Sequence, residues 1–219
     1  MLTDQGQRVG DGESSEGRRT VLQLSRLETF TDVVYALVLW RAFLIRPNPI
    51  QDDWGWRSMG AFFAAEWPAF LAVAIGLAFT MIYWLQSNVL LGQLERTDGR
   101  HTVLVILQLF FLLLFLRVIA MGVAFDPSPG MRALEGLAAA MVGISGAWGW
   151  AYAIKDRRLL PDDISDDAAR RLSDRITAEP ATALFTLPFA FFPILWELSW
   201  FSYPMWVRLV KRRREKKTP

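Results

Sequence analysis

Residues 26–44 read RLETFTDVVYALVLWRAFL, an apolar run that carries ionisable residues where it begins. Asp32 stands inside the mouth of this run, directly before VVYALVLW. An ionised side chain in a membrane helix costs about 2.5–3.5 kcal/mol at the helix centre. Chains keep such a group when it faces a bundle interior, a water path or a partner charge. We therefore take residues 26–44 as the functional element of this chain.

The composition is that of an integral membrane protein. Of the 219 residues, 53% are hydrophobic, and they gather in separate blocks long enough to cross a bilayer. The absence of cysteine excludes disulfides and thiolate chemistry, and a net charge of +2 is too small to predict a nucleic-acid partner. One histidine, His101, and no metal-ligand spacing or nucleophile motif predict no enzyme, no metal site and no cofactor.

The apolar blocks predict an all-α fold of six transmembrane helices. The spans cover about residues 25–45, 61–85, 102–123, 131–154, 181–196 and 199–210, and the last two are short. Residues 1–24 are predicted to be a disordered cytoplasmic tail, and residues 211–219 a basic cytoplasmic tail. The region 181–210 is long for one helix and short for two, so we expect a hairpin turning near Glu197–Tyr203. Five spans with an external basic tail are the alternative.

The basic residues set the predicted orientation. With both termini in the cytoplasm, the inner side of the first four spans receives most of them, as the positive-inside rule requires. We expect a multi-pass plasma-membrane protein whose basic C-terminus binds anionic lipid headgroups. The inner residues are Arg8, Arg18, Arg19, Arg26, Arg96, Arg100, Lys155, Arg157, Arg158, Arg170, Arg171 and Arg175, against Arg46, Arg57 and Arg132 outside.

Two local patterns concern packing. Ala139, Gly143 and Ala147 recur every four residues, a small-residue stripe that permits close helix contact; packing within one subunit is favoured over a dimer face. The polar segment 155–179 is rich in aspartate but lacks the spacing and central glycine of a calcium loop. We expect a solvated helix after Pro161 there.

Two motifs together resemble a known family. Arg26, Phe30, Thr31 and Asp32 form R-x-x-x-F-[ST]-D at the start of the first span, and a second pattern runs from Tyr83-Trp84 to Asp98. The chain resembles the transmembrane protein 175 family of potassium channels, in its short bacterial branch. The likeness covers about residues 26–121, and the remainder agrees by hydropathy alone.

The resemblance implies a passive, potassium-conducting channel, a homotetramer whose first helices line the pore. It implies an apolar constriction at Leu37, with K⁺ as the permeant ion. Helix periodicity places the neighbouring pore-lining positions on or near the same stripe. These positions are Val34, Trp40, Arg41 and Leu44.

The motif residues Arg26, Phe30, Thr31 and Asp32 are implied to tie the first helix to its neighbours. Six residues, or about 240° of helix, separate Arg26 from Asp32, so these two cannot pair with each other. Each needs a partner from another span. The candidates at the same depth are Trp84, Asn88, Asp98 and Arg100.

Departures from the family pattern keep a second hypothesis open. Ser87-Asn88 stands where the family has a histidine pair, Val105 replaces an asparagine, and Trp40 replaces a threonine near the pore axis. Arg41 could repel cations, reach the headgroups or pair with Glu66. The alternative is a non-conducting scaffold or regulatory protein, blocked by Trp40 and Arg41. An outer charge layer is also predicted, of Arg41, Glu66, Arg117, Glu135 and Glu197.

Overall fold

The structure is a computed structural model that describes residues 4–44, 59–124 and 128–215. Within these ranges every regular element is a helix, so the predicted all-α class is confirmed. The helices are α1 (Asp4–Leu44), α2 (Met59–Leu91), α3 (Gly99–Ala124), α4 (Pro129–Ile154), α5 (Asp166–Thr186), α6 (Pro193–Trp200) and α7 (Tyr203–Glu215). Two short 3₁₀ turns, η1 (Lys155–Arg157) and η2 (Leu187–Phe189), follow α4 and α5.

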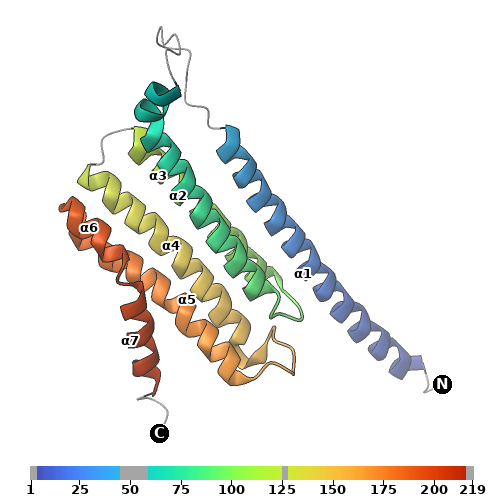
Figure 1. The fold of residues 1–219 in the computed structure, drawn as a ribbon. Helices are drawn as coiled ribbons and strands as arrows, with labels where there is room; N and C mark the ends of the chain where they lie inside the picture. Colours follow the sequence, from blue (N-terminus) through green and yellow to red (C-terminus); the bar gives the residue numbers. More distant parts are fainter. Residues whose placement is uncertain (1–3, 45–58, 125–127, 216–219) are drawn as a thin grey trace.

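The long helices run side by side in alternating directions (Figure 1). α4 lies between α3 and α5, whereas α1 lies at the edge of the bundle and contacts α2 and α3. The start of α1, the end of α7 and the turns at 92–98 and 155–165 lie toward the same end of the molecule (Figure 1). By length and composition, three described segments could cross a membrane: Val73–Leu91, Gly99–Gly122 and Pro129–Arg157.

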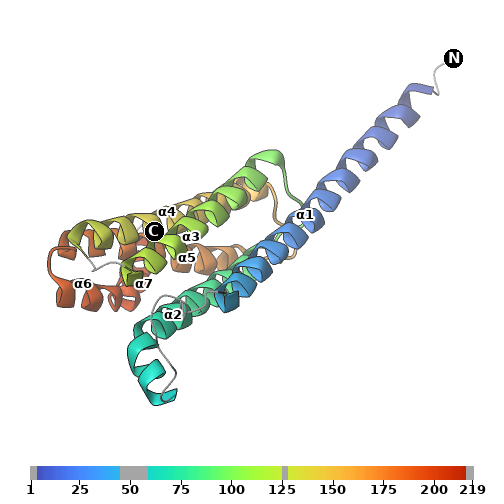
Figure 2. The same ribbon diagram turned by 90° about the horizontal axis from the view of Figure 1, so that it is seen from above.

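The first helix is longer than the sequence predicts. α1 begins at Asp4, so the described part of the tail predicted to be disordered is helical, and it projects beyond the bundle (Figures 1 and 2). No proline interrupts these residues. Leu24 and Leu27 are buried in a cluster with Leu90, Leu91, Leu94, Leu159 and Leu160. This contact anchors the middle of α1 on the bundle, a tertiary effect that local composition does not reveal.

Small residues of α4 seat α5 within the same chain. A Cβ added at Gly143 would lie 2.8 Å from Cδ of Pro180, and one added at Gly136 would lie 2.9 Å from Oγ1 of Thr186. Ala139, between them, is 4% exposed. The small-residue stripe therefore packs inside one subunit, which is the interpretation favoured from the sequence.

α5 is a helix with one buried face. Its first turn is capped by Ser165, whose hydroxyl accepts a hydrogen bond from Ala168 N at 3.3 Å. Arg170 and Arg171 are exposed, whereas Ala169 and Ile176 are buried. The polar segment after Pro161 therefore forms the predicted helix, but α4 covers one side of it.

The C-terminal region departs from the predicted pair of helices. Residues 181–196 comprise the end of α5, η2, a turn at 190–192 and the start of α6, because Pro188 and Pro193 interrupt the helix. A further break at Phe201–Ser202 separates α6 from α7, which packs back against α5. The break at 201–202 lies within the predicted turn region Glu197–Tyr203, but the chain also turns earlier, at 190–192, so the reversal begins before the predicted position. We call α5 to α7 the C-terminal hairpin.

Candidate functional site at helix α1

One face of α1 is buried in the bundle. Leu24, Leu27, Thr31 and Tyr35 recur at intervals of three or four residues and are 1–7% exposed. Tyr35 packs with Tyr83 of α2 and with Leu109 and Leu112 of α3. A spacing of three and four residues puts side chains on one side of a helix. α1 is therefore held through this side.

The other face of α1 is apolar and has no partner in a single chain. Phe30, Val33, Leu37 and Trp40 are 47%, 50%, 60% and 63% exposed, and they follow the same helical spacing. We call these four residues the open face of α1. Val34, predicted to share this stripe, is half-buried and packs toward the core instead. The side chains of Arg41 and Leu44, also predicted to line the pore, lie outside the described residues.

The structure brings one of the motif residues, Asp32, to a candidate partner on another helix. Asp32 Oδ1 accepts a hydrogen bond from Trp84 Nε1 at 2.9 Å, which ties α1 to α2. Thr31 is 1% exposed, and its hydroxyl donates to the carbonyl of Leu27 at 2.8 Å. Arg26 is exposed and, like Phe30, has its side chain away from the buried face. The Asp32–Trp84 bond is therefore the observed link between the motif and α2.

Two other candidate partners of the motif residues form hydrogen bonds elsewhere. Asp98 precedes α3 and accepts hydrogen bonds from the backbone N–H of His101, at 2.8 Å, and from the Tyr152 hydroxyl. Desolvation raises the pKa of Asp98, but these hydrogen bonds outweigh it, so the net pKa lies below its ordinary value. Asn88 is exposed, and its carbonyl accepts from Gly92 N at 2.9 Å. Neither residue contacts the motif, so Asp98 is a helix cap that also holds α4.

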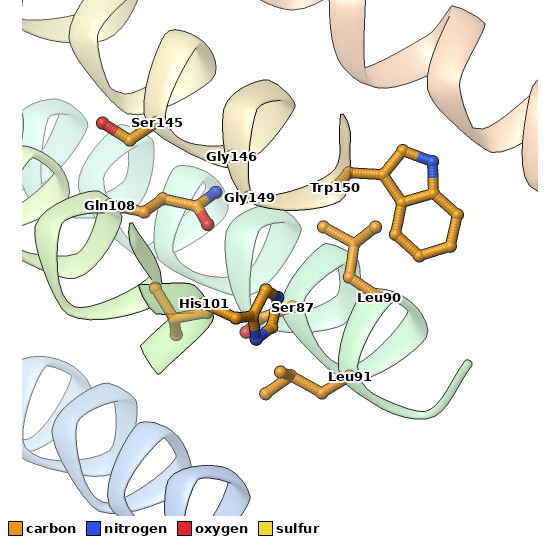
Figure 3. Close-up of a pocket in the computed structure, with 10 residues that line it drawn as sticks. Ser87, Leu90, Leu91, His101, Gln108, Ser145, Gly146, Gly149 and Trp150 are labelled. Atoms are coloured by element: carbon orange, nitrogen blue, oxygen red, sulfur yellow. The ribbon is translucent and has the colours of Figure 1, made fainter. Parts of the chain in front are cut away.

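A small cavity with a mostly apolar lining and a few polar side chains lies between α2, α3 and α4 (Figure 3), and the sequence did not predict it. Its volume is about 20 Å³, enough for roughly one water molecule. Gln108 is the one polar residue in the run LVILQLFFLLLFL. Its isolation in this apolar run is the feature of the sequence from which a buried polar site could have been predicted. His101 is only 4% exposed, and its Nδ1 forms a hydrogen bond with the Thr97 hydroxyl at 2.9 Å. The polar side chains around the cavity are Ser87, His101, Gln108 and Ser145.

The predicted outer charge layer does not form ion pairs among its described members. Arg117 and Glu197 are exposed, Glu135 is half-buried, and no salt bridge joins these three. The side chains of Arg41 and Glu66 lie outside the described residues. At this end of the bundle, the buried Arg132 donates from Nη1 to the carbonyl of Ala190 at 3.0 Å and so closes the turn after η2.

Antiparallel helices of membrane-crossing length, packed through small residues, define an all-helical integral membrane protein. The fold is similar to that of the potassium channel MtTMEM175, whose threonine-to-alanine variant was crystallised in complex with a nanobody–MBP fusion protein. The TM-score is 0.66 at 18% sequence identity, over 87% of this chain and 93% of that chain. The model of the family described as endosomal/lysosomal potassium channel TMEM175 matches residues 26–115, which include both motifs. The resemblance to the TMEM175 family is therefore confirmed. No curated protein matches the chain.

Proposed function

We propose that this chain is a passive cation channel, potassium-conducting, in which four copies place α1 around a common axis. The observation that carries the proposal is the open face of α1, exposed although the opposite face is tightly packed. A contiguous apolar face on one helix marks a surface for another protein or for lipid. The fold shared with a potassium channel favours further copies of this chain as the partner.

Conduction through such an assembly needs no bond chemistry. Leu37 lies near the centre of the open face and would form an apolar ring where the four helices meet. A ring of this kind gates by wetting and dewetting. The Asp32–Trp84 hydrogen bond fixes the rotation of α1 on α2 and so keeps Leu37 directed away from its own bundle.

Ion flux into liposomes tests this function. The purified protein is reconstituted, and potassium and sodium flux are compared for the wild type and Leu37→Ala. We expect selective potassium flux from the wild type and a larger or less selective leak from the variant. Leu113→Ala, an exposed leucine of α3, is the matched control and should leave flux unchanged. If the wild type and Leu37→Ala are both silent in correctly assembled protein, this chain is not a channel.

A second candidate function is a non-conducting membrane scaffold on the same fold. Trp40 favours it, because its indole is 63% exposed on the open face, only three residues beyond Leu37. Four indoles near one axis would narrow the path that ions need. The pore radius at Leu37 and Trp40 in an assembled structure separates the two functions. Trp40→Ala should open potassium flux if the indoles are the block.

The same proposal places the chain in the plasma membrane with six crossings and both termini in the cytoplasm. It is supported by the common end at which the start of α1, the end of α7 and the turns 92–98 and 155–165 lie (Figure 1). Arg208 and residues 211–213 are exposed on α7 near this end. Basic side chains beside a membrane gain about 1 kcal/mol each from anionic headgroups. Replacing residues 211–213 by glutamine should weaken binding of anionic lipid to the purified protein.

A further inference from the structure

Glu179 is a half-buried acidic side chain on α5, where the C-terminal hairpin meets α2. The next residue, Pro180, packs on Gly143 near the middle of α4. The carboxyl group reaches α2, where Gln86 Nε2 donates a hydrogen bond to Oε2 at 3.2 Å. Gln86 itself belongs to the candidate span Val73–Leu91. The carboxyl therefore lies between helices, away from the polar turns at the bundle end.

The Tyr83 hydroxyl on α2 faces the same carboxyl group as a donor, but Oε1 has no hydrogen bond of good geometry. Oε1 of Glu179 is buried and forms no hydrogen bond within the part of the chain that the structure describes. No described lysine or arginine forms an ion pair with it. An ionised carboxylate buried without a counter-charge is strongly disfavoured, whereas the neutral acid loses far less on leaving water.

The groups around the carboxyl offer no positive charge to balance it. Where α5 packs on α4, the neighbouring residue Gly143 carries no charge. The turn η2 contains no ionisable residue. Glu197 of α6 is exposed, as are Arg208 on α7 and Arg175, one turn earlier on α5. The titratable groups that face the carboxyl are the hydroxyls of Tyr83 on α2, Tyr35 on α1 and Tyr203 on α7.

We propose that Glu179 is a proton-binding site whose proton keeps the C-terminal hairpin on α2. When the C-terminal hairpin is packed against α2, Oε1 carries the proton and Oε2 accepts a hydrogen bond from Gln86. Loss of the proton would leave a charge that the interior cannot solvate, so the hairpin would loosen from α2. Because α2 also holds α1 through Trp84, the site couples the proton concentration to the support of the pore helix. The site itself does not depend on whether the chain conducts ions.

Infrared spectroscopy detects the proton directly. In lipid nanodiscs at neutral pH, the wild type should show the carbonyl stretch of a protonated carboxylic acid, and Glu179→Gln should lose one acid's share of it. The glutamine keeps the shape of the side chain and an acceptor for Gln86. Glu197→Gln, an exposed acid on α6, is the matched control and should keep the band. An unchanged band in Glu179→Gln would overturn the proposal.

Hydrogen exchange of the C-terminal hairpin tests the role of the proton. A proton bound only in the seated form favours that form at low pH, so the wild type should lose protection in α5 and α7 as pH rises. Glu179→Gln should keep its protection after correction for the intrinsic exchange rate. Parallel loss in both proteins would show that Glu179 is not the switch. Loss abolished by Tyr83→Phe, but not by Glu179→Gln, would assign the titration to the tyrosine and refute the proposal.

Discussion

Replacing Gly143 by alanine probes how closely α5 is seated on α4. A Cβ at this position would lie 2.8 Å from Cδ, 2.9 Å from N and 3.2 Å from Cα of Pro180. All three distances are shorter than the roughly 3.5–4.0 Å of optimal contact between carbon atoms. N and Cα belong to the backbone of α5, so a rotamer change cannot relieve the overlap. Overpacking of this kind costs about 1–3 kcal/mol.

Helix propensity acts in the opposite direction and has to be separated from the clash. Alanine is favoured over glycine by about 0.8–1.0 kcal/mol in a helix interior. Gly149 supplies the matched control, because it is buried on the same helix and its added Cβ would meet Leu104 Cβ at an ordinary 3.7 Å. Propensity cancels between the two variants. Gly143→Ala should therefore be less stable than Gly149→Ala by about 1–3 kcal/mol, the overpacking cost alone.

Unfolding in detergent, followed by tryptophan fluorescence, measures this difference. Gly146→Ala should fall between the other two, because its Cβ would meet Gln108 Nε2 at 2.6 Å, and this side-chain end can move into the adjacent cavity. Equal stability of Gly143→Ala and Gly149→Ala would refute the reasoning. It would mean that α5 does not lie against α4 at Pro180.

Two further predictions concern the links between helices. A double-mutant cycle with Asp32→Ala and Trp84→Phe should give a coupling of about 0.5–1.5 kcal/mol in unfolding, the typical net value of one hydrogen bond, and additive effects would show that the bond carries no stability. Because the pKa of Asp98 is lowered in the folded protein, its contribution to stability is present above the unfolded value and lost as pH falls through the folded value. Acid unfolding should therefore be less steep in Asp98→Asn, and identical acid profiles would contradict the cap.

The sequence predicts best what depends on local properties. The apolar blocks behind α2, α3 and α4 are long and uninterrupted, so their helical state follows from length and composition. The course of the C-terminal hairpin was harder to predict, because hydropathy counts apolar residues and gives no information on where a chain can turn. Pro188 and Pro193 lie in an apolar stretch, yet they fix the turn at 190–192. Reading the prolines before the hydropathy would have placed the reversal earlier.

Pairs of side chains from different helices could be predicted only where their level along the bundle alone decides which residues meet. Trp84 was a candidate partner of Asp32 because both lie at the same level, and the indole needs an acceptor when it leaves water. Asp98 was a candidate on the same ground, but its partner is Tyr152, which depends on the register of α4 against α3. Glu179 escaped notice because a charge at the edge of an apolar block resembles an interfacial residue. Only the packing of α5 moves it inside.

The rotation of α1 shows how buried polar residues set the direction in which a helix presents its apolar face. Periodicity alone groups Val34 with Leu37, but the structure exposes Val33 instead and turns Val34 toward the core. The cause lies on the opposite side, where Thr31 and Tyr35 are 1% and 2% exposed and fix that face against the bundle. A helix anchored in this way has one remaining apolar face to offer to other copies. Any assembly built on that face brings Leu37 and Trp40 toward the partner together, so in the proposed channel conduction would depend on which of them reaches the axis.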